Sequence, residues 1–250
     1  MNYDTFLEFV KTRRTIRAIK PDPIPDNIAD RLIEAARWAP SGFNMQPWEF
    51  VIVKDPALRA GIKKVVDEYR ANDFFAMEAT REEWQGSPWT PDERGGEFGL
   101  PLAPVFILLL GDTRRNTGLP MAARYTYQKR YSIFDSTLSN AFLYMLLAAH
   151  SLGLAAIYVS ATKYPKVGGL IKSLLNIPSY MELYDMLLVG KSDQKPPSKL
   201  MREKPEMIHF DRARPDEFAS DEAVREQVIR FRAGNIGRHK AADHEKEKRR

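Results

Sequence analysis

Residues 136–159 have the sequence STLSNAFLYMLLAAHSLGLAAIYV, a long apolar stretch with one glycine near its end. Apolar side chains cover nearly every face of a helix over 136–151, and such a helix must be buried in a core or an interface. Gly153 is expected to end this helix, because glycine readily adopts the left-handed conformation that follows a last turn. The apolar run 154–159 then predicts a strand.

Further elements follow on both sides of this stretch. Apolar runs predict a buried strand at 49–53, an interior strand at 105–110 and another strand at 184–189. Because helices and strands alternate without a regular βαβ series, we expect one α+β domain with helices on the faces of a central sheet. Helical spacing of apolar residues predicts a short helix that begins at Thr5 and helices over 26–39, 55–69, 167–175 and 221–232.

Capping residues predict where four of the helices begin. Thr5 and Glu8 form a T-x-x-E capping box. Asp26 and Asp55 are expected to cap the second and third helices, since Asp is a preferred N-cap residue. For the same reason we interpret Asp135, which precedes the long apolar helix, as its N-cap rather than as a catalytic base.

Composition limits the class of protein. The chain has 250 residues, 44% of them hydrophobic and 28% charged, which suits one large folded domain or two small ones. It has no cysteine, so disulfides and cysteine nucleophiles are excluded, and four dispersed histidines do not predict a metal site. No apolar run reaches about 20 residues, and the N-terminus lacks the basic start of a signal peptide, so we expect a cytoplasmic protein without membrane partners.

Positive charge is concentrated in the C-terminal tail. The net charge is +5, and residues 238–250 account for +3 of it. Basic segments can bind nucleic acid. Because this tail mixes both signs of charge, we interpret it as a solvated end and do not expect nucleic-acid binding.

Three arginines form the first candidate site. Arg13, Arg14 and Arg17 lie within five residues, with Thr15 between them. Guanidinium groups match the oxygens of a phosphate monoester, and Thr15 adds a hydroxyl and a backbone N–H. Taken alone, the same cluster is also compatible with a solvated basic turn.

The second candidate site is the loop APSGFNMQPW at 39–48. It lies between a predicted helix end and a predicted strand start, where ligands often bind at the edge of a sheet. Ser41, Asn44 and Gln46 offer neutral donors and acceptors for a flat heterocycle. A capping turn with Trp48 in the core is the alternative interpretation.

Other nucleotide and hydrolase motifs are absent. The chain has no G-x-G-x-x-G, no G-x-x-x-x-G-K-[ST] and no G-x-S-x-G. The motifs of dinucleotide-binding domains, of nucleotide hydrolases with a phosphate-cradling loop and of serine hydrolases with a nucleophile elbow are therefore missing.

Taken together, the two candidate sites resemble the FMN-dependent nitroreductase family. The similarity covers about residues 5–212, and the later segments also resemble the subgroup that includes iodotyrosine deiodinase. The matching motifs are RRTIR at 13–17, APSGxNxQPW at 39–48, AAHSLGL at 148–154, LLVG at 187–190 and REKP at 202–205.

The resemblance implies a nitroreductase-like fold with a mostly antiparallel sheet flanked by helices. It also implies an intertwined homodimer with two FMN sites at the subunit interface, in which a C-terminal extension wraps the partner. We accordingly expect an FMN-binding domain over 1–212, with a lid or excursion at 72–102, and a helical extension with a charged tail over 213–250.

The resemblance also assigns roles to residues of this sequence. Arg202 matches a second phosphate-binding arginine, with Lys204 as the alternative because the spacing before Pro205 differs by one residue. The positions that hold the flavin phosphate and the ring edge are matched by the segment Arg13, Arg14, Thr15, Ile16 and Arg17. The loop against the flavin is matched by Pro40, Ser41 and Gly42, and the contacts to the ribityl chain or the ring by Asn44 and Gln46. The strand end that faces flavin N5 is matched by Tyr158, Val159 and Ser160.

The lid departs from the deiodinase pattern. That subgroup closes over a zwitterionic substrate with a Glu, a Tyr and a Lys, but residues 68–89 contain no clear Glu-x-x-x-Tyr pair. Aromatic residues of the lid region, together with three tyrosines further along the chain, either stack a planar substrate over the flavin or pack the lid against the core. These residues are Phe74, Phe75, Trp84, Trp89, Tyr125, Tyr127 and Tyr131.

We therefore expect an oxidoreductase in which NADH or NADPH reduces FMN, which then reduces a nitroaromatic, a quinone or a related conjugated acceptor by ping-pong transfer through N5. A hydroxyl at Ser160 would favour one-electron chemistry, whereas a backbone N–H there would favour hydride transfer. The alternatives are a reductive dehalogenase of halophenols or halotyrosines, and a non-enzymatic binding protein that kept the fold.

Overall fold

The computed structural model describes residues 2–74, 76–77, 80, 99–195 and 199–231. Contacts divide the chain into two compact units, one of Met1–Arg70 with Phe98–Pro196 and one of Ala71–Glu97 with Pro197–Arg250. Most of the expected excursion at 72–102, including Phe75, Trp84 and Trp89, lies outside the described residues. The expected boundary at residue 212 stays a prediction.

The first unit is built on a four-stranded antiparallel sheet. Its strands are β1 (Trp48–Val53), β2 (Val105–Asp112), β3 (Ala155–Val159) and β4 (Met181–Gly190), in the order β1-β2-β4-β3. Every neighbouring pair is antiparallel, which confirms the predicted α+β class and the antiparallel sheet. All eight residues of β2 are buried, because this strand lies between two others and under helices on both faces.

Strand β1 differs from the prediction of a buried strand. Glu49 is exposed, and Ile52 is 37% exposed. The physical reason is that β1 lies at the edge of the sheet and pairs only with β2. The run at 49–53 is apolar enough for a strand, but the sequence does not show whether that strand lies at the centre or at an edge of the sheet.

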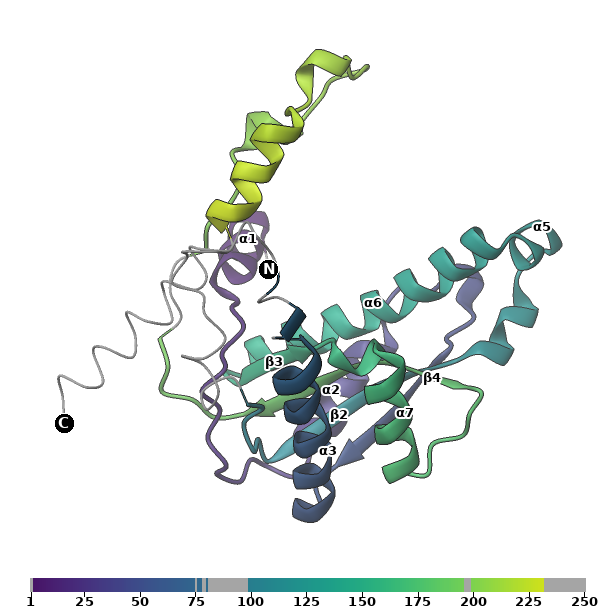
Figure 1. Ribbon diagram of the computed structural model, residues 1–250, viewed down its shortest axis with the longest axis vertical. Helices are drawn as coiled ribbons and strands as arrows, with labels where there is room; N and C mark the ends of the chain where they lie inside the picture. Colours follow the sequence, from purple (N-terminus) through teal and green to yellow (C-terminus); the bar gives the residue numbers. More distant parts are fainter. Residues whose placement is uncertain (1, 75, 78–79, 81–98, 196–198, 232–250) are drawn as a thin grey trace. The chain divides into compact units, whose positions relative to one another are not determined.

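Helices cover both faces of the sheet (Figure 1). Helices α2 (Ile28–Arg37) and α6 (Tyr127–Ser151) pack together on the face that contains Ile107 and Leu109. The opposite core contains Phe106 and Leu108 and includes residues of α3 (Pro56–Tyr69) and α7 (Pro165–Leu174). This alternation follows from the period of two in a strand.

Helix α6 is longer than predicted. It begins at Tyr127 rather than near Ser136, and Asp135 therefore lies inside the helix and is not its N-cap. No proline or glycine interrupts 127–135, and the Asp135 carboxylate instead pairs with Lys163 Nζ at 2.8 Å. The predicted end is confirmed, since Gly153 has a φ of 68°.

Two other capping predictions are wrong by one or a few residues. The N-cap of α1 (Tyr3–Thr12) is Asn2, whose Oδ1 accepts from the Thr5 backbone N–H at 2.9 Å. Helix α2 follows Asn27, while the Asp26 carboxylate lies 3.2 Å from Lys54 Nζ. The prediction at α3 is confirmed, because Asp55 Oδ1 accepts from the Leu58 backbone N–H at 2.8 Å.

The second unit is described by itself. It contains residues 71–74 of the short π-helix η2 (Arg70–Phe74) and a helix over 221–231. It also contains two short 3₁₀ helices, which are η7 (Lys204–Met207) and η8 (Pro215–Glu217). His209 and Arg214 both contact the Glu217 carboxylate, at 3.1 and 3.0 Å. In the part of the chain that the structure describes, no helix has both the length and the apolar composition that a membrane span needs.

Close packing of α6 on the sheet requires a glycine in β2. A Cβ on Gly111 would lie 2.3 Å from Phe134 Cζ and 2.7 Å from Leu138 Cδ1. Both neighbours are buried core side chains, so neither can move away freely. Gly169, on the exposed side of α7, has open space around the same position.

We predict that Gly111→Ala lowers the free energy of unfolding by about 1–3 kcal/mol, because the added methyl overpacks the contact between β2 and α6. The matched control is Gly169→Ala, which should raise the free energy of unfolding by up to about 1 kcal/mol, because alanine is the better helix former. Chemical denaturation of both variants measures the difference. Equal effects at the two positions would contradict this account of the packing.

Candidate functional site

The arginine segment is fixed beside the edge strand β3. The Ile16 backbone N–H donates to the Ala156 carbonyl at 3.3 Å. The backbone N–H groups of Arg17 and Ala18 both donate to Gln194 Oε1 at 3.2 Å. The backbone of residues 16–18 is therefore attached to β3 and to Gln194, and the segment is not a loose basic turn.

The arginines form a concentrated positive charge. Burial, with help from the neighbouring Arg14, lowers the pKa of half-buried Arg13, and desolvation lowers the pKa of Arg17. Arg70 at the end of α3 belongs to the same group: burial lowers its pKa, the charge of Arg17 adds to that effect, and Asp67 opposes it. Such a set favours an anion with several acceptor oxygens, such as a phosphate monoester.

Sequence reasoning missed Arg70. It stands alone at the end of a helix and far from residues 13–17 in the chain, so no local pattern marks it. No role was predicted for His150, although it lies in the AAHSLGL motif. Its Nε2 lies 3.0 Å from Thr12 Oγ1 and its ring lies 4.8 Å from Phe9, so it joins the end of α6 to α1.

The loop at 40–46 is held on α6. The Gly42 backbone N–H donates to Thr137 Oγ1 at 3.1 Å, and Asn140 Nδ2 donates to the Pro40 carbonyl at 3.2 Å. A Cβ on Gly42 would lie 2.3 Å from Ile133 Cγ2, so only glycine fits this close approach.

The polar side chains of the loop are organised among themselves. Ser41 Oγ accepts from the Gln46 backbone N–H at 3.4 Å, and Gln46 Nε2 donates to Asn44 Oδ1 at 2.8 Å. Asn44 and Gln46 are exposed and have positive φ values of 52° and 46°. These amides can therefore reach a ligand from the surface of the turn, as neutral donors and acceptors.

The two candidate sites are attached to different elements of the first unit. Residues 13–17 contact β3 and the segment after β4, whereas the loop contacts α6 and β2. The link to β2 is the Asp112 backbone N–H, which donates to the Pro47 carbonyl at 2.7 Å. A ligand that uses both sites therefore draws on groups held by different elements, from one copy of the chain or from two.

The end of β3 contacts a buried acid on β4, Asp185, which the sequence did not predict. The Tyr158 hydroxyl donates to Asp185 Oδ2 at 2.5 Å, and Asp185 is 0% exposed. A bulge in the pairing of β2 with β4 turns both Tyr184 and Asp185 towards the α6 side of the sheet. Asp185 lies inside an apolar run of the sequence. No periodic pattern in that run predicts the bulge or shows that the carboxylate points inward.

Asp185 is held where ionisation is costly. Burial raises its pKa to about 6, and Asp135 adds to the rise, while the Tyr158 hydroxyl and the charge of Lys163 oppose it. Asp185 Oδ1 is buried, and within the described part of the chain it has no hydrogen-bond partner. Burial and the bond to Asp185 also raise the pKa of Tyr158. Ser160, two residues further along, is exposed at the start of a short turn.

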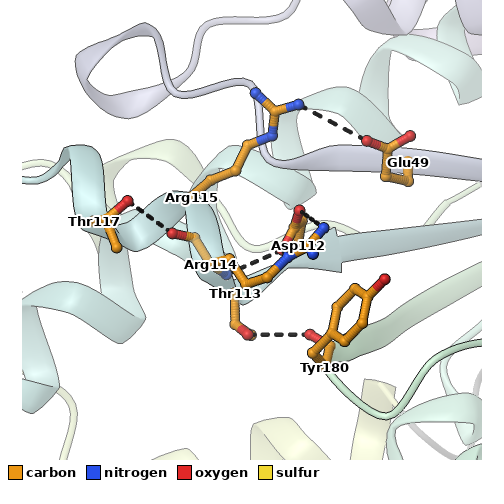
Figure 2. Close-up of polar contacts among 7 residues, drawn as sticks. All are labelled: Glu49, Asp112, Thr113, Arg114, Arg115, Thr117 and Tyr180. Carbon is orange, nitrogen blue, oxygen red and sulfur yellow. Dashed lines mark hydrogen bonds and ion pairs between the residues drawn. The ribbon is translucent and has the colours of Figure 1, made fainter.

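The far end of β2 is clamped by an arginine (Figure 2). Arg114 Nε and Nη2 donate to the two carboxylate oxygens of Asp112 at 2.9 and 2.8 Å. The guanidinium lies 4.0 Å from the centroid of the Tyr180 ring, and Thr113 Oγ1 donates to the Tyr180 carbonyl at 3.0 Å. This fork holds the pKa of Asp112 below its usual value.

Arg202 belongs to the second unit. Its Nη2 donates to the Glu206 carbonyl at 2.8 Å, and its Nε lies 3.7 Å from the Glu206 carboxylate. Lys204, the alternative, begins η7. Both residues are exposed, and their proposed role in phosphate binding stays a prediction.

The match to a family model decides the classification. The model described as the nitroreductase family matches residues 10–191, which include the arginine segment, the 40–46 loop and all four strands. The chain belongs to the nitroreductase family. The resemblance inferred from the motifs is thereby confirmed.

Relatives of this nitroreductase-family chain fall into two groups. Iodotyrosine deiodinase 1 of Rattus norvegicus is 29% identical over 196 residues, which are 76% of this chain and 63% of the relative. The chain thus spans less than two thirds of the length of that relative. A Methanothermobacter thermautotrophicus protein, provisionally named an NADH dehydrogenase or NAD(P)H nitroreductase, is 25% identical over 82% of this chain and 86% of its own length.

A solved structure agrees with this classification. Oxidized iodotyrosine deiodinase bound to FMN and 3-iodo-L-tyrosine has 25% identity and a TM-score of 0.63, covering 83% of this chain and 99% of that chain. The fold of this nitroreductase-family chain is therefore shared with a flavoprotein.

We predict that the Asp185→Asn variant gains stability relative to the wild type as pH rises. The pKa of Asp185 is about 6 in the folded chain and about 3.9 when unfolded, so the folded wild type binds more protons and loses stability between about pH 4 and pH 6. The asparagine side chain of the variant cannot ionise, and the difference in free energy of unfolding should shift by about 3 kcal/mol in its favour across this window.

Urea denaturation at pH 4 and pH 7 measures this shift. The Tyr158→Phe variant is the control, since loss of the hydroxyl should move the window to higher pH rather than remove it. A difference between wild type and Asp185→Asn that is independent of pH would show that Asp185 is ionised throughout.

Proposed function

We propose that this chain is an FMN-dependent oxidoreductase. The observation that carries the proposal is the set of arginines at 13–17, fixed beside β3 and joined by Arg70, which suits a doubly charged phosphate monoester. The relatives that bind FMN or are named NAD(P)H nitroreductases support the same cofactor and electron donor.

The donor set of the chain fits FMN. Arg13, Arg14 and Arg17 would hold the phosphate, with Thr15 and Ile16 contributing backbone or hydroxyl contacts and Arg202 as a further ligand. The turn at 40–42 would face the ring, Asn44 and Gln46 would bind the ribityl chain or the ring edge, and residues 158–160 would contact the ring. When bound, FMN supplies a centre that accepts and donates a hydride.

We also propose that the active form is a homodimer. Large apolar side chains are exposed on α6 and on the two segments next to it, which is unusual for a monomer. A second copy would cover them and would bring the loop of one copy to the arginines of the other. The exposed residues are Trp38 (78%), Phe43 (62%), Leu143 (46%) and Tyr144 (37%).

The chain's own residues would then act by binding and orientation. The arginines neutralise the phosphate, and the amides of the loop fix the ring edge. The hydrogen bond from Tyr158 to Asp185 holds the end of β3, and with it Ser160, in one position. A planar acceptor binds where these groups meet and takes the reducing equivalents, with a proton from solvent.

We predict that Arg13→Gln weakens FMN binding by about tenfold or more, because it removes a charge-assisted hydrogen bond to the phosphate. The matched control is Arg31→Gln on α2, which changes the same charge at an exposed position away from both candidate sites. Quenching of FMN fluorescence on titration measures both affinities. Equal affinities of the two variants would place the phosphate elsewhere.

We predict that the purified protein is yellow, and that NADH or NADPH bleaches it in the absence of oxygen. A nitroaromatic or a quinone should restore the colour, with ping-pong kinetics. Absorbance at the flavin band measures each half of the cycle. A colourless protein that does not bind added FMN would contradict the proposed function.

Reductive dehalogenation is the second candidate function, favoured by the similarity to iodotyrosine deiodinases. It would convert an aryl halide, two electrons and a proton into the arene and a halide ion. Incubating reduced protein with 2-iodophenol and with 4-nitrobenzoate separates the candidates. Iodide release without nitro reduction would favour the dehalogenase, and the reverse result would favour the nitroreductase.

A further inference from the structure

The first unit contains a cavity of about 340 Å³. It is formed by η5 (Thr113–Gly118), α5 (Met121–Tyr125), the N-terminal half of α6 and the start of β4. Its size suits a small ligand. None of the proposed FMN residues lines it. The lining residues are Thr113, Asn116, Thr117, Arg124, Tyr127, Arg130, Tyr131, Phe134 and Glu182.

One wall of the cavity is aromatic. The rings of Tyr127 and Tyr131 are separated by 6.0 Å with an angle of 18° between their planes, and Phe134 follows one turn later on α6. Tyr127 and Tyr131 remain 63% and 46% exposed. Rings that stay exposed in this arrangement can stack on a planar ligand.

The cavity also contains two half-buried arginines. Arg130 Nη1 donates to the Arg124 carbonyl at 3.2 Å, which holds its guanidinium near the wall. Among the described residues, no carboxylate lies within ion-pair distance of Arg124 or Arg130. Glu182, an exposed residue at the start of β4, is the one acid in the lining. The cavity therefore has an excess of positive charge, and a carboxylate fits the guanidinium forks.

A third group of lining residues is uncharged and polar. Thr117 Oγ1 donates to the Arg114 carbonyl at 2.9 Å and keeps acceptor capacity. Asn116 Oδ1 is buried and has no hydrogen-bond partner among the described residues, a costly state that a ligand N–H or O–H would relieve. The ligand is thus expected to carry a donor as well as a negative charge.

The polar rim is built before any ligand binds. The fork from Arg114 to Asp112 and the bond from Thr113 to the Tyr180 carbonyl fix η5 to the ends of β2 and β4 (Figure 2). A preformed rim reduces the loss of conformational freedom on binding.

We propose that this cavity is a second ligand site, which takes a small planar aromatic carboxylate with a hydrogen-bond donor on its ring. The guanidinium groups of Arg124 and Arg130 bind the carboxylate, and the tyrosine rings stack on the aromatic plane. The Asn116 carbonyl oxygen accepts from the ring substituent. None of the residues proposed to bind FMN takes part in this site, although Tyr127 and Tyr131 are also two of the residues that the sequence offered for stacking a planar substrate.

The test is calorimetric titration of the full-length protein with 4-hydroxybenzoate and with 4-hydroxybenzamide, an uncharged compound of the same shape. We expect the carboxylate to bind at least about tenfold more tightly, and Arg130→Gln to remove about tenfold of that affinity. Arg115→Gln is the matched control, because Arg115 lies on the same η5 turn, outside the lining, 3.9 Å from Glu49.

Arg124→Gln, measured in the same way, keeps the test valid if Arg130→Gln does not fold. Equal affinity for the acid and the amide would overturn the proposal, as would equal losses in Arg130→Gln and Arg115→Gln. Titrations in the presence and absence of bound FMN separate the two proposals. Loss of FMN binding with intact carboxylate binding would contradict only the proposed function.

Discussion

The close contact of α6 with its surroundings is the constraint on which the other features of this chain depend. Two glycines, Gly42 and Gly111, allow the loop and β2 to approach this helix more closely than any side chain would permit. Because interiors are close-packed, this contact fixes the positions of the loop, the end of β2 and the helix relative to one another. Each functional feature on the α6 side of the sheet is positioned by these three segments.

Charge is divided between two sides of the first unit. Arginines are concentrated beside β3, where desolvation lowers the pKa values of Arg13 and Arg17, and the Asp185 carboxylate is buried on the α6 side, where burial raises its pKa. In both places the fold desolvates ionisable groups, which destabilises their charged forms. Ionisable groups with shifted pKa values are typical of binding sites and also of structural networks of charges. A phosphate would offset this cost for the arginines, and the Tyr158 hydroxyl offsets part of it for Asp185.

Membership of the nitroreductase family establishes the fold, while the chemistry depends on particular residues. The relatives include iodotyrosine deiodinases and a protein provisionally named an NAD(P)H nitroreductase, and one solved deiodinase structure is bound to FMN and 3-iodo-L-tyrosine. The arginines and the loop amides suit the cofactor in either case. Under the proposed function, the choice between the two activities would depend on the groups that surround the substrate.

The sequence by itself determined the α+β class, four strands, the long buried helix and the two motif segments, because these depend on local periodicity and on residue types close together in the chain. Only the tertiary structure decided that β1 is an edge strand, that Asp135 pairs with Lys163 inside α6, and that Asp185 meets Tyr158. It also decided that Arg70 joins Arg17 and that a cavity forms beside η5. These features depend on packing between distant segments, and the energy of burying or pairing a group cannot be read from its neighbours in sequence.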